Sequence, residues 1–387
     1  MKTTLLLLIP LYILKTCNTS SNGSSTPEID TSAASSHSHS TLSASEIAAY
    51  SQAAAAFYEK ALDKPSFNGA FLVAKNGQIV YEKYRGYFDI KKKDSLLNEA
   101  SAFHIASISK TFTAMATLKL WELGKLSLDD DLSKYFPSFP YEGVTIKMLM
   151  NHRSGLPNYV HYFDKYKWDK RKYVSNQDVL QSLYDYKPGL QYPVGKRFSY
   201  CNTNYALLAL IIEKVSGMSY ADFLQSNFFN PLNMNDTYVF SMADTARAMP
   251  SYEYNGRKFD LEFLDLVYGD KNIYSTPRDL LKWDQAMYPG SGFLKAATLD
   301  SAYTPYSFEK PGIKNYGLGW RMFVYPNGKK IIYHNGWWHG NNTVMTRLMQ
   351  DSATIIVLGS KRNNNIYRVK PLFEVFSHYN GKEELDQ

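Results

Sequence analysis

The stretch FHIASISKTFTAMATLKLWEL occupies residues 103–123, and Gly124, a residue typical of the position just after a helix, follows it. Large apolar side chains recur along it at Phe112, Met115, Leu118 and Trp121. This spacing predicts an amphipathic helix of about four turns. We expect the rest of the chain to be organised around this helix.

Ser107 and Lys110 stand three positions apart at the N-terminal end of this helix. Side chains at positions i and i+3 are neighbours on a helix surface, with Cβ atoms about 5–6 Å apart. A serine hydroxyl becomes a strong nucleophile when a base accepts its proton, and Lys110 is the nearest candidate base. The same spacing recurs at Ser307 and Lys310, but a Pro-Gly pair follows at once, so we interpret that copy as chance.

The composition predicts a folded enzyme rather than a nucleic-acid-binding or disordered protein. The chain has 387 residues, 44% of them hydrophobic, enough for one large domain with an inserted subdomain or for two domains. The net charge is +7, but basic residues are interleaved with acidic ones, which argues against nucleic-acid binding. Neither Cys-x-x-Cys nor His-Glu-x-x-His occurs and the eight histidines are dispersed, so we expect no metal and no other cofactor.

The N-terminal sequence is typical of a secretion signal. An apolar run at residues 5–14 follows Lys2 and is too short to span a bilayer, which predicts a signal peptide over residues 1–17. Leu14 lies three residues before Cys17, and this spacing resembles a bacterial lipoprotein signal in which the cysteine is lipidated. Lys15 departs from the small residues usual there, so an ordinary signal peptide cleaved nearby is the alternative. Either reading places the protein outside the cytoplasm, in the periplasm or anchored to a bacterial membrane.

A linker and a single domain are predicted after the signal. Residues 18–42 are rich in Ser, Thr, Asn and Ala and predict a flexible tether. Ser43 and Glu46 match a capping box, so we expect the domain to begin there and to extend over residues 43–387.

The order of elements predicts an α+β fold. Strands are expected at 69–74 and 78–84, joined by an Asn-Gly turn, and mostly helical sequence fills 125–285. Further strands are predicted at 317–325, 331–333, 342–349 and 353–359, before a final helix at 365–377. We therefore predict an antiparallel sheet built from N- and C-terminal segments and flanked by helices. An inserted helical subdomain would leave a cleft over the N-terminal end of the central helix.

Two short motifs fall where this architecture would bring them to that cleft. Tyr200-Cys201-Asn202 is predicted on a loop before a helix at 205–216, and His334-Asn335-Gly336 at the end of a strand, followed by Trp337. Either motif alone is compatible with a half-buried core tyrosine or a histidine satisfied at a strand end. Because both motifs follow Ser-x-x-Lys in the chain and all three are expected at the same cleft, the three motifs together indicate a site more strongly than any one of them alone.

Taken together, Ser-x-x-Lys, Tyr-x-Asn and His-x-Gly resemble the penicillin-recognising serine hydrolases. This is the serine β-lactamase and penicillin-binding protein-like family, in its branch of class C β-lactamases, D-alanyl-D-alanine carboxypeptidases and esterases. The resemblance extends from about residue 68 to 360. Further similar stretches are LMNHRSGLP at 149–157, YALLALIIEKVSG at 205–217, YSTPRDL at 274–280 and YGLGW at 316–320.

The resemblance implies a role for each matched residue. Ser107 would attack a carbonyl and form an acyl-enzyme, with Lys110 and Tyr200 sharing the proton. Asn202 would bind a substrate amide, and the strand at His334–Trp337, which includes Gly336, would run alongside the acyl group. The backbone N–H groups of Ser107 and Trp337 would form the oxyanion hole.

The sequence departs from the family's patterns at three points. Tyr-Cys-Asn replaces the class A triplet Ser-Asp-Asn, so the glutamate-assisted class A mechanism is not expected. His334 replaces the lysine of Lys-Thr-Gly, which weakens carboxylate anchoring unless an arginine or lysine elsewhere substitutes for it. With an ordinary pKa near 6.5, His334 would make activity on carboxylate substrates fall as the pH rises through that value. Cys201 is interpreted as a small buried residue, not a second nucleophile.

These observations predict an exported serine hydrolase. It would act on amide or ester substrates, namely D-Ala peptides of peptidoglycan, small esters or β-lactams, with membrane contact through a lipid anchor at Cys17. The alternative is a non-catalytic penicillin-type sensor or binding protein that kept the fold. The intact set Ser107, Lys110 and Tyr200 favours the enzyme.

Overall fold

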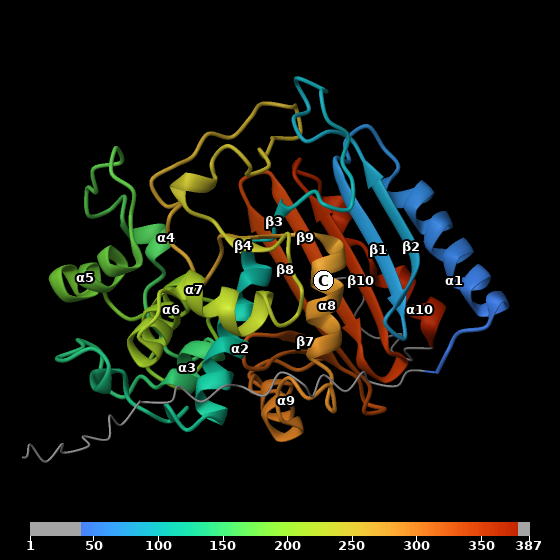
Figure 1. Cartoon of the computed structure of the whole chain (residues 1–387). Helices are drawn as coiled ribbons and strands as arrows, with labels where there is room; N and C mark the ends of the chain where they lie inside the picture. The colour runs from blue at the N-terminus through green and yellow to red at the C-terminus, as the bar shows by residue number, and fades with distance from the viewer. Residues whose placement is uncertain (1–39, 378–387) are drawn as a thin grey trace, which may run out of the picture. The chain divides into compact units, whose positions relative to one another are not determined.

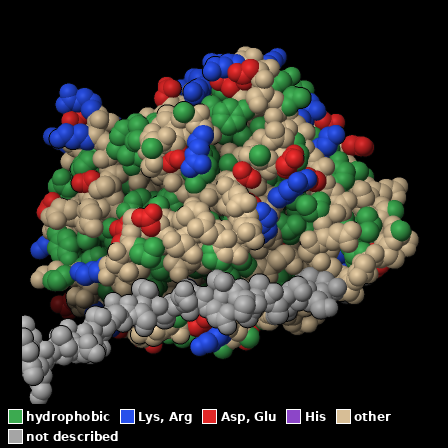
Figure 2. All heavy atoms as spheres, viewed as in Figure 1, with side chains coloured by type: hydrophobic (Ala, Val, Ile, Leu, Met, Phe, Trp, Pro, Cys, Tyr) green, Lys and Arg blue, Asp and Glu red, His purple; other side chains and the backbone are tan. Residues whose placement is uncertain are grey.

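The computed structural model describes residues 40–377, all of which belong to one compact unit of the chain. The predicted signal peptide with Cys17 and nearly all of the predicted linker lie outside the described residues. Within 40–377, no helix has both the length and the apolar character that crossing a membrane requires. Lys and Arg side chains lie beside Asp and Glu side chains over the face shown in Figure 2, as the interleaved sequence predicts.

A seven-stranded antiparallel sheet in the order β2-β1-β10-β9-β8-β7-β6 forms the centre of the unit. Its strands are β1 (Gly69–Lys75), β2 (Gln78–Arg85), β6 (Lys314–Tyr316), β7 (Arg321–Val324), β8 (Lys330–Trp338), β9 (Asn341–Leu348) and β10 (Ala353–Gly359). The N-terminal hairpin joins the C-terminal strands through β1 and β10, which pair from Gly69↔Gly359 to Lys75↔Ala353. Figure 1 shows this join as blue strands lying beside red ones. The predicted fold class is confirmed.

The first hairpin follows from local sequence. Asn76 and Gly77 have φ angles of 53° and 74°, the left-handed conformation that a tight hairpin turn requires and that Asn and Gly adopt readily. Along β1, Phe71 and Val73 pack in one apolar cluster, whereas Ala70 and Leu72 pack in another. Both faces of the sheet are therefore covered.

Helices flank the sheet on both faces (Figure 1). The helices are α1 (Ala44–Phe57), α2 (Ser109–Glu122), α3 (Ile146–Met150), α4 (Tyr159–Tyr162), α5 (Asn176–Tyr186), α6 (Asn202–Ser216), α7 (Tyr220–Leu224), α8 (Pro277–Ala286), α9 (Ala296–Ala302) and α10 (Phe373–Phe376). Ser43 caps helix α1 and forms the predicted capping box with Glu46. A second small sheet of β3 (Phe103–His104), β5 (Ile273–Ser275) and β4 (Tyr238–Val239) lies within the mostly helical part.

The predicted helix of about four turns is present as the 14-residue α2, but the prediction that it is amphipathic is wrong. Residues 103–108 form β3 and a 3-10 turn (Ala106–Ile108), so the helix itself begins at Ser109. Eleven of the 14 residues of α2 are buried. The helix is enclosed because α6 packs along it and Trp283 of α8 stacks on Phe112 with ring centres 4.1 Å apart. A helix buried all round needs no polar face.

Three predicted boundaries also differ. Strand β8 continues to Trp338 because β9 pairs with it as far as Trp338↔Asn341, so His334-Asn335-Gly336 lies within the strand rather than at its end. Helix α6 begins at Asn202, three residues earlier than predicted. The predicted helix at 365–377 is replaced by 3-10 turns and the short α10, because Pro371 lies inside it.

Candidate active site

Ser107 lies in the 3-10 turn between β3 and α2, half-buried, and we call residues 105–108 the nucleophile turn. Ala106 just before it has φ +49°, the left-handed region that residues other than glycine seldom adopt. Two hydrogen bonds hold Ile105 in place, one from its N–H to the Ile273 carbonyl and one from Thr343 Oγ1 to its own carbonyl, each 2.9 Å. Because N–H groups in a first helical turn lack intrahelical acceptors, that of Ser107 is free of a helical partner.

Lys110 lies on α2, one turn after Ser107, and is fully buried. Its Nζ lies 3.1 Å from Ser107 Oγ and donates a 2.8 Å hydrogen bond to the backbone carbonyl of Asp270. The same Nζ lies 5.0 Å from the ring centre of Tyr200 and 5.6 Å from that of Tyr205. The structure therefore brings the Tyr200 ring to the serine and the lysine, which lie on a different segment of the chain.

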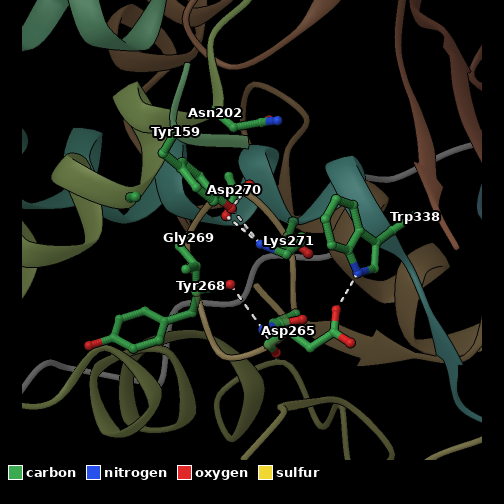
Figure 3. Close-up of polar contacts among 12 residues, drawn as sticks. Tyr159, Asn202, Asp265, Tyr268, Gly269, Asp270, Lys271 and Trp338 are labelled. Atoms are coloured by element: carbon green, nitrogen blue, oxygen red, sulfur yellow. Dashed lines mark hydrogen bonds and ion pairs between the residues drawn. The ribbon is translucent and has the colours of Figure 1, made fainter. Parts of the chain in front are cut away.

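A buried polar cluster fixes the segment that holds Lys110. Figure 3 shows Tyr159 and Lys271 directed at Asp270: the Tyr159 hydroxyl donates to Asp270 Oδ2 at 2.8 Å, and Lys271 Nζ lies 3.7 Å from Oδ1. Burial lowers the pKa of Lys271, and the Asp270 carboxylate opposes that shift. Asp270, which the sequence interpretation missed, therefore positions Lys110 through its carbonyl while its side chain is held elsewhere.

Tyr200 lies between a histidine and an arginine that the sequence interpretation also missed. Its ring centre lies 4.3 Å from that of His152 and 4.9 Å from the guanidinium carbon of Arg321 on β7. Within residues 40–377, no carboxylate lies within ion-pair distance of Arg321. Arg321 lies on β7, the strand next to β8, which carries His334. The only feature of the sequence that points to Arg321 is its position directly after the YGLGW stretch.

His334 is fully buried and held in one tautomer. Its Nδ1 lies 2.8 Å from the Asn335 carbonyl, so Nδ1 carries the proton, and Nε2 can accept from the Tyr316 hydroxyl at 3.3 Å. Burial, reinforced by the positive charges of Arg321 and Lys110, holds the pKa of His334 well below its ordinary value. The expected titration of His334 near pH 6.5 is therefore wrong.

The second half of β8 presents an open edge. Strand β7 pairs with β8 only from Lys330 to Tyr333, so from His334 to Trp338 β8 has β9 as its sole strand partner within residues 40–377. At Gly336, an added Cβ would lie 2.4 Å from the Ile105 carbonyl oxygen and 2.2 Å from Thr343 Oγ1. Glycine therefore lets this face of β8 pack directly against the nucleophile turn. Trp337, next along, is 60% exposed.

The other residues of the Tyr-x-Asn motif have distinct surroundings. Asn202 is the first residue of α6, and Figure 3 shows its side chain directed away from Tyr159. Its amide side chain makes no hydrogen bond within the described residues, which leaves it available to a ligand. Cys201 is buried with Sγ 3.3 Å from the Leu156 carbonyl, and burial raises the pKa of its thiol to about 11. The interpretation of Cys201 as a small buried residue is confirmed.

The second Ser-x-x-Lys copy is not built like the first. Ser307 and Lys310 lie in the loop between α9 and β6, and Lys310 is exposed. No helix joins the two residues, as expected of a chance match.

One group of side chains within 40–377 has metal-ligand geometry. Single ligand atoms of Glu262, Asp265 and His339 lie within 4.8 Å of one another. Both oxygens of Asp265 are already engaged, by His339 Nε2 at 2.9 and 3.0 Å and by the Trp338 indole N–H at 2.6 Å. This cluster is adequately explained by the hydrogen bonds of Asp265 with His339 and Trp338, which fix the end of β8.

The sequence and the fold of this chain are similar to those of known proteins. The Beta-lactamase family model matches residues 54–372. A penicillin-binding protein of Bacillus subtilis (strain 168) is 35% identical over 327 residues, which cover 80% of this chain and 72% of the relative. The structure of a penicillin-binding protein from Bacillus halodurans superposes with a TM-score of 0.70 at 23% identity, covering 83% of this chain and 98% of the other.

A D-amino acid amidase from Ochrobactrum anthropi SV3, solved with L-phenylalanine amide, has a TM-score of 0.67 at 22% identity, covering 86% and 97% of the two chains. At this identity the likeness shows the fold alone. The resemblance that the sequence motifs carry is confirmed at the level of the family. The chain belongs to the Beta-lactamase family of serine hydrolases.

Proposed function

We propose that Ser107 is the nucleophile of an acyl-enzyme mechanism on amide or ester substrates. The observation that carries this proposal is the 3.1 Å distance between Ser107 Oγ and Lys110 Nζ, with the Tyr200 ring 5.0 Å from the same nitrogen. Lys110 Nζ is within hydrogen-bond reach of the hydroxyl, which is the geometry that a base needs to accept the proton of the nucleophile.

The proposed reaction has two halves. Ser107 Oγ bonds to the substrate carbonyl carbon while its proton passes to the Lys110–Tyr200 pair, and the leaving nitrogen or oxygen departs with that proton. Water then attacks the acyl carbon, gives a proton to the same pair, and Ser107 recovers its proton as the acid product leaves. The N–H groups of Ser107 and Trp337 would bind the oxyanion in both halves.

We further propose that Arg321 anchors a substrate carboxylate. His334 is uncharged, whereas the guanidinium of Arg321 is permanently charged, lies over Tyr200 and lacks a carboxylate partner within residues 40–377. A guanidinium binds a carboxylate through two parallel hydrogen bonds. The open edge of β8 would pair with the substrate backbone, as extended peptides do with exposed strands. Substrates with a free carboxylate, namely D-Ala-terminated peptides and β-lactams, fit this arrangement better than neutral esters, with Asn202 binding the acyl-side amide.

The proposed location is the cell envelope. A signal peptide at residues 1–17, a lipidated Cys17 and a tether at 18–42 would place the domain in the periplasm or at a membrane surface, where peptidoglycan peptides occur. Labelled palmitate fed to cells should enter the wild-type chain and not the Cys17→Ala variant. Equal labelling of the two chains would contradict the anchor.

The catalytic proposal is tested by covalent labelling. A fluorescent penicillin and a fluorophosphonate should each label the wild-type protein and fail to label Ser107→Ala. Turnover of nitrocefin, a D-Ala-D-Ala peptide and p-nitrophenyl butyrate then ranks the substrate classes. Labelling by neither probe would reject the proposal, and labelling without turnover of any substrate would favour a penicillin-type sensor.

A further inference from the structure

His104 lies on β3, two residues before Ala106, and is only 4% exposed. Its ring meets the edge of the Tyr274 ring, with centres 5.1 Å apart. His104 is buried and titratable, but it has no role in the mechanism proposed above. Its two nitrogens nevertheless face the nucleophile turn on one side and the segment at 265–272 on the other.

The hydrogen bonds of Asn272 determine which nitrogen of His104 carries the proton. The Asn272 side-chain amide donates both of its hydrogens, to the backbone carbonyls of Asp265 and Val267. Its Oδ1 must therefore accept, and the partner at 3.1 Å is His104 Nε2. Nε2 accordingly carries the hydrogen, and Nδ1 of neutral His104 is left as an acceptor.

That acceptor faces the backbone of the nucleophile turn. The Ala106 N–H donates to His104 Nδ1 at 3.1 Å. Ala106 is the residue held at φ +49°, a conformation that costs energy and persists only where its surroundings enforce it. His104 therefore accepts a hydrogen bond from Ala106, the strained residue immediately before Ser107.

We propose that neutral His104 is a positioning residue, which holds the left-handed turn at Ala106 so that the Ser107 hydroxyl and N–H stay aligned for acylation. This inference rests on the proposed role of Ser107. His104 does not touch the reacting atoms, and Gly336 and Thr343 restrain the turn from its other side. Without the acceptor at Nδ1, the buried Ala106 N–H would lose its partner and the turn would relax.

The surroundings of His104 keep it neutral over the working range of pH. Burial lowers the pKa of His104 to about 4, although the hydrogen bond with Asn272 and the charge of Asp265 oppose this shift. His339 and Lys271 act in the same direction as burial. Below that value a second proton would occupy Nδ1 and remove the acceptor.

A pocket of about 380 Å³ opens against His104 and makes chemical rescue feasible. Its walls include His104, Asn272, Tyr274 and Trp338, and Figure 3 shows the indole of Trp338 directed at Asp265 beside it. Replacing His104 by alanine should leave a cavity that connects to this pocket. Imidazole can then occupy the vacated site and accept the Ala106 N–H.

Matched substitutions separate positioning from packing. Asn places an amide oxygen where Nδ1 lies, Gln places one where Nε2 lies, and Phe keeps the ring without either nitrogen. We expect the fluorophosphonate labelling rate of His104→Asn to stay near wild type and that of His104→Phe to fall roughly 10- to 100-fold. The loss should appear in kcat with KM nearly unchanged, because the substrate groove is untouched, and imidazole should raise the rate of His104→Ala. The wild-type decline in rate near pH 4 should weaken in His104→Asn.

The outcomes distinguish the two proposals. If wild type and Ser107→Ala label equally, the proposed function fails. If Ser107 labels normally but His104→Phe keeps the wild-type rate, or His104→Asn is as slow as His104→Phe, the inference about His104 fails alone. Should the Phe variant not fold, the Asn and Gln pair decides, since only Asn supplies the acceptor to Ala106; equal rates for these two variants would overturn the inference.

Discussion

Replacing Gly336 by alanine tests how closely β8 must approach the nucleophile turn. The added methyl carbon would lie 2.4 Å from the Ile105 carbonyl oxygen, 2.2 Å from Thr343 Oγ1 and 3.0 Å from Ala106 Cβ. Ordinary contact begins at 3.4 Å, so the turn and the strand must separate by about 1 Å. No left-handed φ is recorded at Gly336, so the effect isolates the steric contact.

The consequence should be large for acylation and moderate for stability. A displacement of about 1 Å at a reacting centre costs roughly 100-fold in rate. Overpacking of this kind destabilises a protein by about 1–3 kcal/mol. Burst labelling with fluorescent penicillin measures the acylation rate, and urea unfolding measures the free energy of unfolding.

A matched control exists at Gly189, where an added Cβ meets nothing within 4 Å and the φ angle is not left-handed. Gly189→Ala should change the free energy of unfolding by no more than about 0.5 kcal/mol and leave labelling unaltered. A Gly336→Ala variant that labels as fast as the Gly189→Ala variant would refute the claim that this contact positions the serine.

Four further predictions follow from the same geometry. Arg321→Ala should raise KM for a D-Ala-D-Ala peptide roughly 10- to 100-fold while p-nitrophenyl butyrate hydrolysis is unchanged, and parallel losses on both substrates would contradict carboxylate anchoring. His334→Lys should leave the slope of the pH–rate profile between pH 6 and 8 as it is in wild type, because the pKa of His334 lies well below that range; a wild-type inflection that the variant abolishes would show otherwise. Since the folded-state pKa of His104 (about 4) lies below its unfolded value near 6.5, its contribution is fully present above pH 6.5 and is lost as the pH falls towards 4. That loss is about 3 kcal/mol, and urea unfolding at pH 7 and 4.5 should show a smaller decline in His104→Asn than in wild type. Arg347→Met should destabilise the fold by about 3–5 kcal/mol by leaving Asp284 buried without its partner, and adding Asp284→Leu should restore most of the loss if the pair is the cause.

Elements set by neighbouring residues could be predicted from the sequence. The Asn76-Gly77 turn and the capping box of Ser43 with Glu46 depend on contacts a few positions apart, and both are present. The pairing of N- and C-terminal strands could be inferred because strands occur at both ends of the chain and helices between them. These features need no knowledge of distant contacts.

The missed features depend on residues far apart in the sequence. Arg321 reaches Tyr200 because β7 begins at Arg321, opposite Tyr333 of β8, and the carbonyl of Asp270 reaches Lys110 because a buried cluster holds its segment. Neither of these two contacts produces a periodic pattern or a fixed residue spacing in the sequence. The burial of α2 on all sides was hidden for the same reason, since its polar residues are satisfied by distant partners, such as Thr113 Oγ1 with the Gly269 carbonyl.

The join between β1 and β10 has a consequence for how the protein is made. Asn68 and Ser360 are hydrogen-bonded across that join although 292 residues separate them in sequence. A ribosome adding about 5–20 residues per second therefore releases the first hairpin long before its partner strand exists. Until residues 353–359 have been translated, β1 of the nascent hairpin lacks the strand that pairs with it in the folded protein. Completion of the sheet is thus a long-range event that waits for β10, and holding chaperones should bind the chain until that strand is made.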